Sequence, residues 1–284
     1  MTTSIFFAVL FAACLHAVWN SLVKGSADKH ATMFAVVLGH VPGAVLAMPF
    51  APSIDLSALP WIIGGVALHL GYQLFLIAAY RVGDLTLVYP IARGSAPLIV
   101  TAVSIGVLGV SFTRFELSGV VLIALGLVCL ALVRRTDGSR NPKAVAMALC
   151  TGVFIAAYSL VDGIGARVAT TALGFWIWAA IGNALALTVW TALVRPRTFT
   201  LLKEDRRVFW IGLIGGAASF VAYGVVIWAF TQAPIALVTA LRETSIVFAM
   251  LIGVGVLKER LDLVKVVSTF IMIFGAILLR TSKS

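Results

Sequence analysis

Three charged side chains lie inside long apolar runs of the sequence. Arg93 follows Pro90 in one run, and the adjacent Arg242 and Glu243 lie in another run near the C-terminus. A charge at membrane depth is costly unless it is paired or lines a wet cavity. A guanidinium binds carboxylate or phosphate through two parallel hydrogen bonds, so we interpret both arginines as sites for an anionic group. Glu243 could pair with Arg93, bind an amine or exchange a proton; the alternative for all three is an ion pair that only joins helices.

Two pairs of polar residues in other apolar runs have helical spacing. His16 and Asn20 are four residues apart, as are His69 and Gln73, so each pair shares one face of a helix. Such pairs suggest the wall of a common cavity. Hydrogen bonding between helices is the alternative, and we favour it for the two histidines.

Aromatic residues deep in the apolar runs could stack on a flat or cationic solute, although packing explains any single one. Those singled out are Trp19, Tyr89, Tyr158, Trp176 and Tyr223. Asp162 falls at the end of a run, and we expect its carboxylate to reach the membrane interface together with Lys24.

The composition indicates that these residues lie on membrane-spanning helices. Of the 284 residues, 61% are hydrophobic and 11% are charged, and the mean hydropathy is +1.09. These values exclude a soluble enzyme, a disordered chain and a nucleic-acid-binding protein. A spanning helix needs about 20 apolar residues. Ten runs meet this length, at about 4–23, 31–50, 59–80, 85–108, 113–133, 143–162, 171–194, 207–231, 235–256 and 263–279. We therefore predict an all-α integral membrane protein with ten transmembrane helices.

The basic residues in the gaps between runs indicate the orientation in the membrane. Alternate gaps beginning with the first hold 15 Lys and Arg, and the opposite side holds 4. Because the basic side is cytoplasmic, this bias places both termini outside a bacterial cytoplasmic membrane.

Weak internal repetition divides the chain in two. Residues 79–98 resemble 229–248 at an offset of 150, and residues 21–25 resemble 159–163 at an offset of 138. Both offsets place a boundary after the fifth run, which predicts a first five-helix repeat over 1–138 and a second, inverted repeat over 139–284. Inverted repeats are typical of secondary transporters, whose substrate site lies at the repeat interface.

Short motifs then resemble a known family. Trp19-Asn20 ends the first run, residues 84–90 read DLTLVYP, and residues 257–261 read LKERL before the last run. With the five-plus-five arrangement, the chain resembles the EamA-type branch of the drug/metabolite transporter superfamily. The resemblance implies a solute carrier, often an exporter of metabolites such as amino acids. Many members of the superfamily have cytoplasmic termini, contrary to the charge bias here.

The sequence therefore predicts a secondary active transporter that exports a small polar or zwitterionic, amino-acid-like metabolite by alternating access. The alternatives on the same fold are a lipid-linked substrate flippase and a carrier of organic or phosphorylated anions. The sequence contains no HExxH, GxSxG or ATP-binding loop, so we expect no enzyme activity, metal or cofactor. Proton coupling is possible, and the unit could be a monomer or a homodimer.

Overall fold

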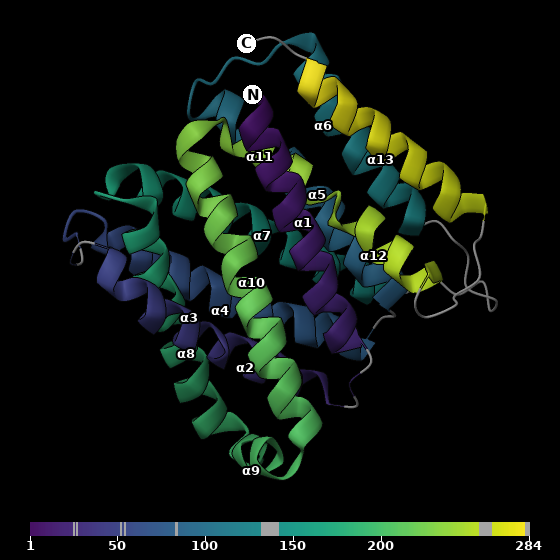
Figure 1. Cartoon of the computed structure of the whole chain (residues 1–284). Coiled ribbons are helices and arrows are strands. Elements are labelled where there is room, and N and C mark those ends of the chain that lie inside the picture. Colours follow the sequence, from purple (N-terminus) through teal and green to yellow (C-terminus); the bar gives the residue numbers. More distant parts are fainter. Residues whose placement is uncertain are drawn as a thin grey trace.

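The computed structural model describes residues 1–24, 26, 28–51, 53, 55–82, 85–131, 142–255 and 263–281. Every regular element in this part is helical, as predicted (Figure 1). In chain order the elements are α1 (Thr3–Lys24), α2 (Lys29–Leu38), α3 (His40–Ala47), the short 3₁₀ helix η1 (Met48–Phe50), α4 (Leu59–Val82), α5 (Leu85–Gly106), α6 (Arg114–Ala131), α7 (Pro142–Val168), α8 (Ala172–Val194), α9 (Arg197–Glu204), α10 (Arg206–Gln232), α11 (Ile235–Arg242), α12 (Ser245–Gly255) and α13 (Leu263–Thr281).

Helices occupy all ten predicted runs, but not as ten uninterrupted helices. The run 31–50 divides into α2, α3 and η1, and the run 235–256 divides into α11 and α12. Within the described residues, seven helical segments are long and apolar enough to cross a membrane, while Ile91–Gly106 and Val266–Thr281 form shorter apolar helices. The structure is thus that of a multi-pass membrane protein, with fewer qualifying spans than the ten predicted.

Large apolar side chains cover the outer faces of the bundle. Examples of exposed residues are Phe7, Phe115, Leu185, Leu193, Phe209 and Phe270. Contiguous exposed apolar surface of this kind is rare in water and is expected against lipid tails. Lipid contact therefore explains why the outward side of these helices is as apolar as the inward side.

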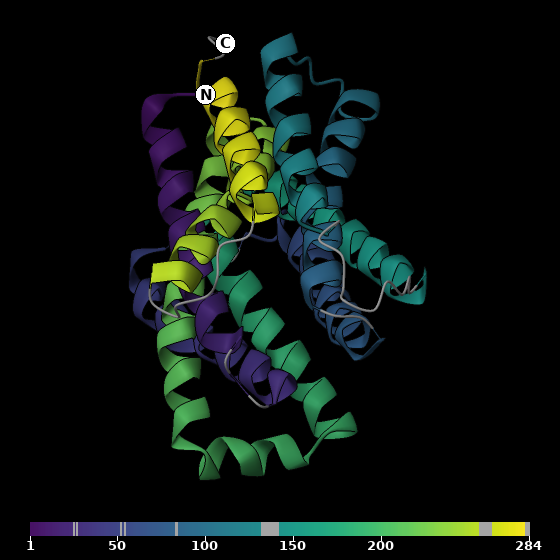
Figure 2. The same cartoon turned by 90° about the vertical axis from the view of Figure 1, so that its right-hand side faces the viewer.

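The helices pack in pairs around one large buried apolar cluster and two smaller ones. α1 lies against α10 and α12, α7 lies against α4 and α5, and α6 lies against α13. The two termini lie at one end of the bundle, and α9 crosses the opposite end (Figures 1 and 2).

Glycines allow α2 and α10 to approach closely. A Cβ on Gly216 would lie 2.5 Å from Gly39 Cα and 2.7 Å from Val36 O, and a Cβ on Gly212 would lie 2.9 Å from Ala35 O. The Gly212-x-x-x-Gly216 spacing, which the sequence assigns to close helix packing, has that role here.

Candidate functional site

Arg93 and Glu243 form an ion pair between α5 and α11. Arg93 Nε lies 2.6 Å from Glu243 Oε2, and the two side chains are 3% and 0% exposed. Glu243 follows the last residue of α11, where its N–H bonds Ala240 O at 3.1 Å and the chain turns into α12. The pair proposed from the sequence is therefore present, at a break between two helices.

Arg242 approaches the same carboxylate from the preceding position. Its Nη2 is 3.6 Å from Glu243 Oε1, and its Cζ lies 5.9 Å from the ring centres of both Tyr158 and Tyr223. Adjacent helical residues point about 100° apart, which explains why Arg242 does not reach hydrogen-bond distance. Arg242 Nε and Nη2 have no hydrogen-bond partner among the described residues. Two guanidinium groups thus share one carboxylate, and one of them keeps free donors.

His16 on α1 extends this cluster. Its Nε2 lies 3.1 Å from Arg93 Nη2, and its Nδ1 lies 3.2 Å from Trp19 Nε1. Because guanidinium and indole N–H groups only donate, a neutral imidazole can accept from one of them at a time. Asn20 instead donates to the backbone oxygen of His16 at 2.8 Å. The structure therefore brings His16 and Trp19 to the charges but uses Asn20 within its own helix.

Asp162 is a buried residue of this region that the sequence interpretation did not place in the candidate site. It is buried, with 1% exposure, and its Oδ2 accepts hydrogen bonds from Tyr223 Oη at 2.6 Å and His69 Nε2 at 2.8 Å. The expected position at the membrane interface is wrong because α7 continues to Val168, six residues past Asp162. The Asp162-Gly163 dipeptide is typical of a turn, so the local sequence did not mark Asp162 as buried.

Aromatic rings enclose this carboxylate. His69 stacks on Tyr158 with ring centres 4.1 Å apart, and Trp176 meets Tyr223 edge-on at 4.9 Å. Tyr72 contacts Tyr158 edge-on at 5.6 Å. We call His69, Tyr72, Tyr158, Trp176 and Tyr223 the aromatic cage. Because Arg242 lies over two of its rings, the cage connects the Asp162 group to the Arg93–Glu243 pair.

The sequence profile of the EamA-like transporter family matches residues 142–281. The chain belongs to this family. It therefore lies in the drug/metabolite transporter superfamily, as the sequence resemblance predicts, and its family consists of membrane transporters of small solutes.

Solved structures show the same fold over the whole chain. One crystal structure with 16% identity superposes with a TM-score of 0.74, over 98% of this chain and 96% of the other. At that identity the likeness establishes the fold alone. No curated protein matches the chain.

Of the residues predicted to bind solute in this EamA-family chain, Gln73 lies apart from the charged cluster, and the position of Tyr89 is not tested. Gln73 donates to Asn183 Oδ1 on α8 at 3.4 Å, so it does not share the partner of His69. Tyr89 belongs to α5, but its side chain lies outside the described residues.

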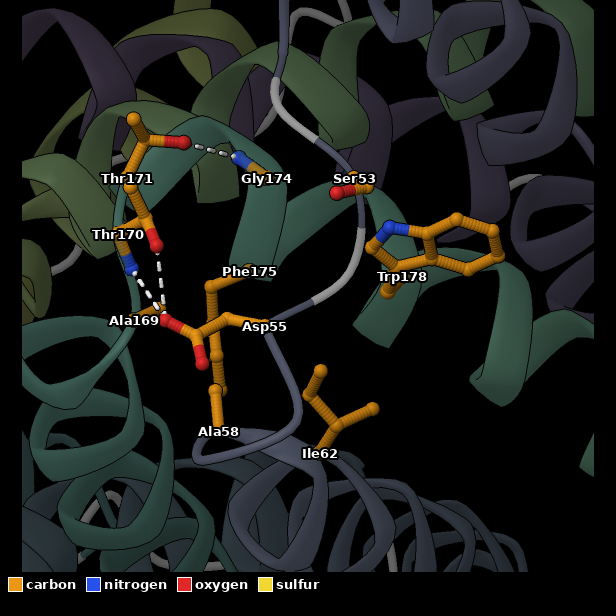
Figure 3. A pocket seen from close by; sticks show the side chains of 10 residues that line it. All are labelled: Ser53, Asp55, Ala58, Ile62, Ala169, Thr170, Thr171, Gly174, Phe175 and Trp178. Atoms are coloured by element: carbon orange, nitrogen blue, oxygen red, sulfur yellow. Dashed lines mark hydrogen bonds between the residues drawn. The ribbon is translucent and has the colours of Figure 1, made fainter.

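A separate polar contact joins the loop before α4 to the turn after α7 (Figure 3). Asp55 Oδ2 accepts from Thr170 N and Oγ1 at 3.0 and 2.8 Å, and Asp55 Oδ1 accepts from Ser57 Oγ at 2.6 Å. Hydrogen bonds from Ser57 and Thr170 lower the pKa of Asp55 to about 2. The carboxylate is stabilised in its charged form, so this contact persists at neutral pH and is lost only as the pH falls toward that pKa.

Proposed function

We propose that the chain is a secondary active transporter of the cytoplasmic membrane that exports zwitterionic, amino-acid-like solutes by alternating access. The observation that carries the proposal is the buried Arg93–Glu243–Arg242 cluster between α5 and α11. Intramembrane charges that are costly to bury are by default functional. Arg242, with Nε and Nη2 free of hydrogen-bond partners in the described part, is suited to the carboxylate of a solute.

The helix contacts support two inverted repeats, over 1–138 and 139–284. α1 packs against α10 and α12, and α7, its equivalent in the second repeat, packs against α4 and α5, which are the equivalents of α10 and α12. The family profile covers 142–281, which is nearly the whole second repeat.

The position of the ion pair supports the same arrangement. Arg93 and Glu243 are related by the offset of 150 residues seen in the sequence. Two equivalent residues can touch only near the axis that relates the repeats. Because their side chains are 2.6 Å apart, the cluster is suited to be the central site around which the two repeats move.

Charge balance favours a zwitterion over a simple anion. The buried cluster and the Asp162 group contain two guanidinium groups and two carboxylates. A solute with no net charge leaves this balance unchanged, whereas an anion would add an uncompensated charge in a medium where charge is costly.

Flux in proteoliposomes tests the proposal. Purified protein should exchange radiolabelled alanine, threonine, glutamine or phenylalanine, and should not exchange sugars or organic anions. Arg93→Ala should lower this exchange by about tenfold or more, since it removes an intramembrane charge from the site. Arg114→Ala, which changes an exposed arginine at the start of α6, is the matched control. Exchange of organic anions alone would favour the anion carrier, and full activity of Arg93→Ala would remove Arg93 from the site.

A further inference from the structure

We infer that His69 and Asp162 together bind the proton of the empty carrier and release it when the amino group of a solute binds beside Asp162. This inference rests on the proposed function and adds the coupling ion and the place where it is exchanged. The sequence pointed to Glu243 as a proton-exchanging group, whereas the geometry points to the Asp162 group.

The hydrogen bonds at Asp162 define which atom takes the proton. Tyr223 Oη donates to Asp162 Oδ2 at 2.6 Å. A carboxylate only accepts, so His69 Nε2, at 2.8 Å from the same oxygen, carries its hydrogen toward Asp162. The second ring nitrogen, His69 Nδ1, is then the atom that gains or loses the exchangeable proton.

His69 and Asp162 differ in burial, and proton exchange requires the group that gains the proton to be the more exposed of the two. The side chain of His69 is 15% exposed, whereas Asp162 is 1% exposed. Asp162 Oδ1 has no hydrogen-bond partner among the described residues. The pair therefore combines a partly exposed histidine with a buried carboxylate that can offset a positive charge.

Few charged groups face Asp162 from the helices packed against α7. α8 contributes Trp176 and Asn183 but has no ionisable residue. The ionisable side chains linked to Asp162 directly or through the aromatic cage are His69 and Tyr72 on α4, Tyr158 on α7, Tyr223 on α10, Arg242 on α11 and His40 on α3, which meets Trp176 edge-on at 5.7 Å. Arg93 on α5 pairs with Glu243. The groups in contact with Asp162 are thus a phenol and an imidazole, and both guanidinium groups lie toward Glu243.

Glu243 is less suited to exchange a proton. It lies 2.6 Å from Arg93 and 3.6 Å from Arg242, so protonating it would leave two buried cations without a counter-charge. Removing the charge of one partner in a buried pair is strongly unfavourable. Asp162 contacts no permanent cation, and it keeps its hydrogen bonds from Tyr223 and His69 when His69 is neutral.

One buried carboxylate can offset one positive charge. An imidazolium at His69 and the ammonium group of a solute would both require Asp162, so binding of the ammonium favours loss of the proton. The aromatic cage is suited to either cation: His69 stacks on Tyr158 at 4.1 Å, and Arg242 lies 5.9 Å from the faces of Tyr158 and Tyr223. Solute leaving the cell is thereby exchanged for a proton entering it.

Two measurements on the full chain in proteoliposomes test the inference. Counterflow of radiolabelled alanine, threonine, glutamine and phenylalanine at equal pH on both sides measures solute exchange alone. A pH-sensitive dye in the lumen, with an outward gradient of the same amino acids, measures proton movement. Wild-type protein should show counterflow, and its lumen should acidify as the solute leaves.

Variants then separate the proton from the solute. His69→Gln keeps an N–H donor for Asp162 but cannot titrate, so acidification should fall by at least about fivefold when it is expressed per molecule of solute moved, which divides out any loss of counterflow. Asp162→Asn should abolish acidification and weaken the apparent solute affinity by about tenfold or more, because a charge-assisted hydrogen bond is lost. The matched controls are His30→Gln, at the start of α2, and Asp205→Asn, which preserves the N-cap of α10; both should behave as wild type.

The outcomes distinguish the two proposals. Wild-type counterflow without acidification would overturn the inference and leave the proposed transporter intact. Wild-type acidification per solute in both His69→Gln and Asp162→Asn would overturn it as well. The absence of counterflow for every amino acid in wild-type protein would overturn the proposed function itself.

Discussion

At the scale of residues, the core of the molecule contains two buried carboxylates with different surroundings. Glu243 faces two guanidinium groups, at 2.6 and 3.6 Å. Asp162 instead accepts from a phenol and an imidazole, at 2.6 and 2.8 Å. Groups of the same type in different environments take different roles. We therefore assign charge neutralisation to Glu243 and proton exchange to the His69–Asp162 pair.

Because Arg93 and Arg242 share the carboxylate of Glu243, we expect loss of Glu243 to destabilise the protein more than loss of Arg93. Glu243→Gln leaves both Arg93 and Arg242 without a counter-charge, whereas Arg93→Met leaves Glu243 beside Arg242. Breaking a buried ion pair costs about 3–5 kcal/mol. Glu243→Gln should therefore lower the melting temperature in detergent more than Arg93→Met, and the double variant should fall between them. Equal losses in the two single variants would contradict the shared arrangement.

The sequence predicted the Arg93–Glu243 pair but not the Asp162 group, for a physical reason. Arg93 and Glu243 interrupt apolar runs near their middle, so hydropathy alone indicates that both side chains lie deep in the membrane. Asp162 falls where a run of average length would end, and only packing of α7 against α4 and α10 shows that it is buried. Partners such as His69 and Tyr223 lie on distant segments, and no local pattern joins them to Asp162.

At the scale of elements, helix breaks and close packing position the site. The turn between α11 and α12 carries Glu243, and α2 and α10 meet backbone to backbone at Gly39, Gly212 and Gly216. The type of every element except α9, which lies in the gap between two runs, was predictable from long apolar runs. The division of two runs into shorter helices was not, because Gly39 and Thr244 interrupt helices only in the packed bundle.

Two glycine substitutions separate close packing from helix propensity. A Cβ on Gly216 would lie 2.5–2.7 Å from backbone atoms of Gly39 and Val36, whereas a Cβ on Gly64 of α4 would meet only Val161 Cγ1, at 3.6 Å. Gly216→Ala should destabilise the protein by about 1–3 kcal/mol, since backbone atoms cannot move aside easily. Gly64→Ala should be neutral or stabilising. Thermal unfolding in detergent measures both, and equal melting temperatures would show that the α2–α10 contact adjusts freely.

At the scale of the whole molecule, the ends of the bundle differ in charge. The gaps that hold 15 of the basic residues include the segment around α9, which lies at the end opposite the termini (Figure 1). The start of α1 and the end of α13 lie together at the other end, where Arg280 donates a hydrogen bond to Thr3 (Figure 1). The charge count could be made from the sequence, but the common end of the two termini depends on the assembled bundle.

This asymmetry predicts the orientation in the membrane. Because basic loops remain cytoplasmic, α9 should face the cytoplasm and both termini should lie outside. Alkaline phosphatase, which is active only outside the cytoplasm, should be active when fused after Ser284, and green fluorescent protein fused there should stay dark. Fusions after Lys203 on α9 should give the reverse and serve as the matched control. Fluorescence at the C-terminus would contradict the charge argument and would support the cytoplasmic termini of many superfamily members.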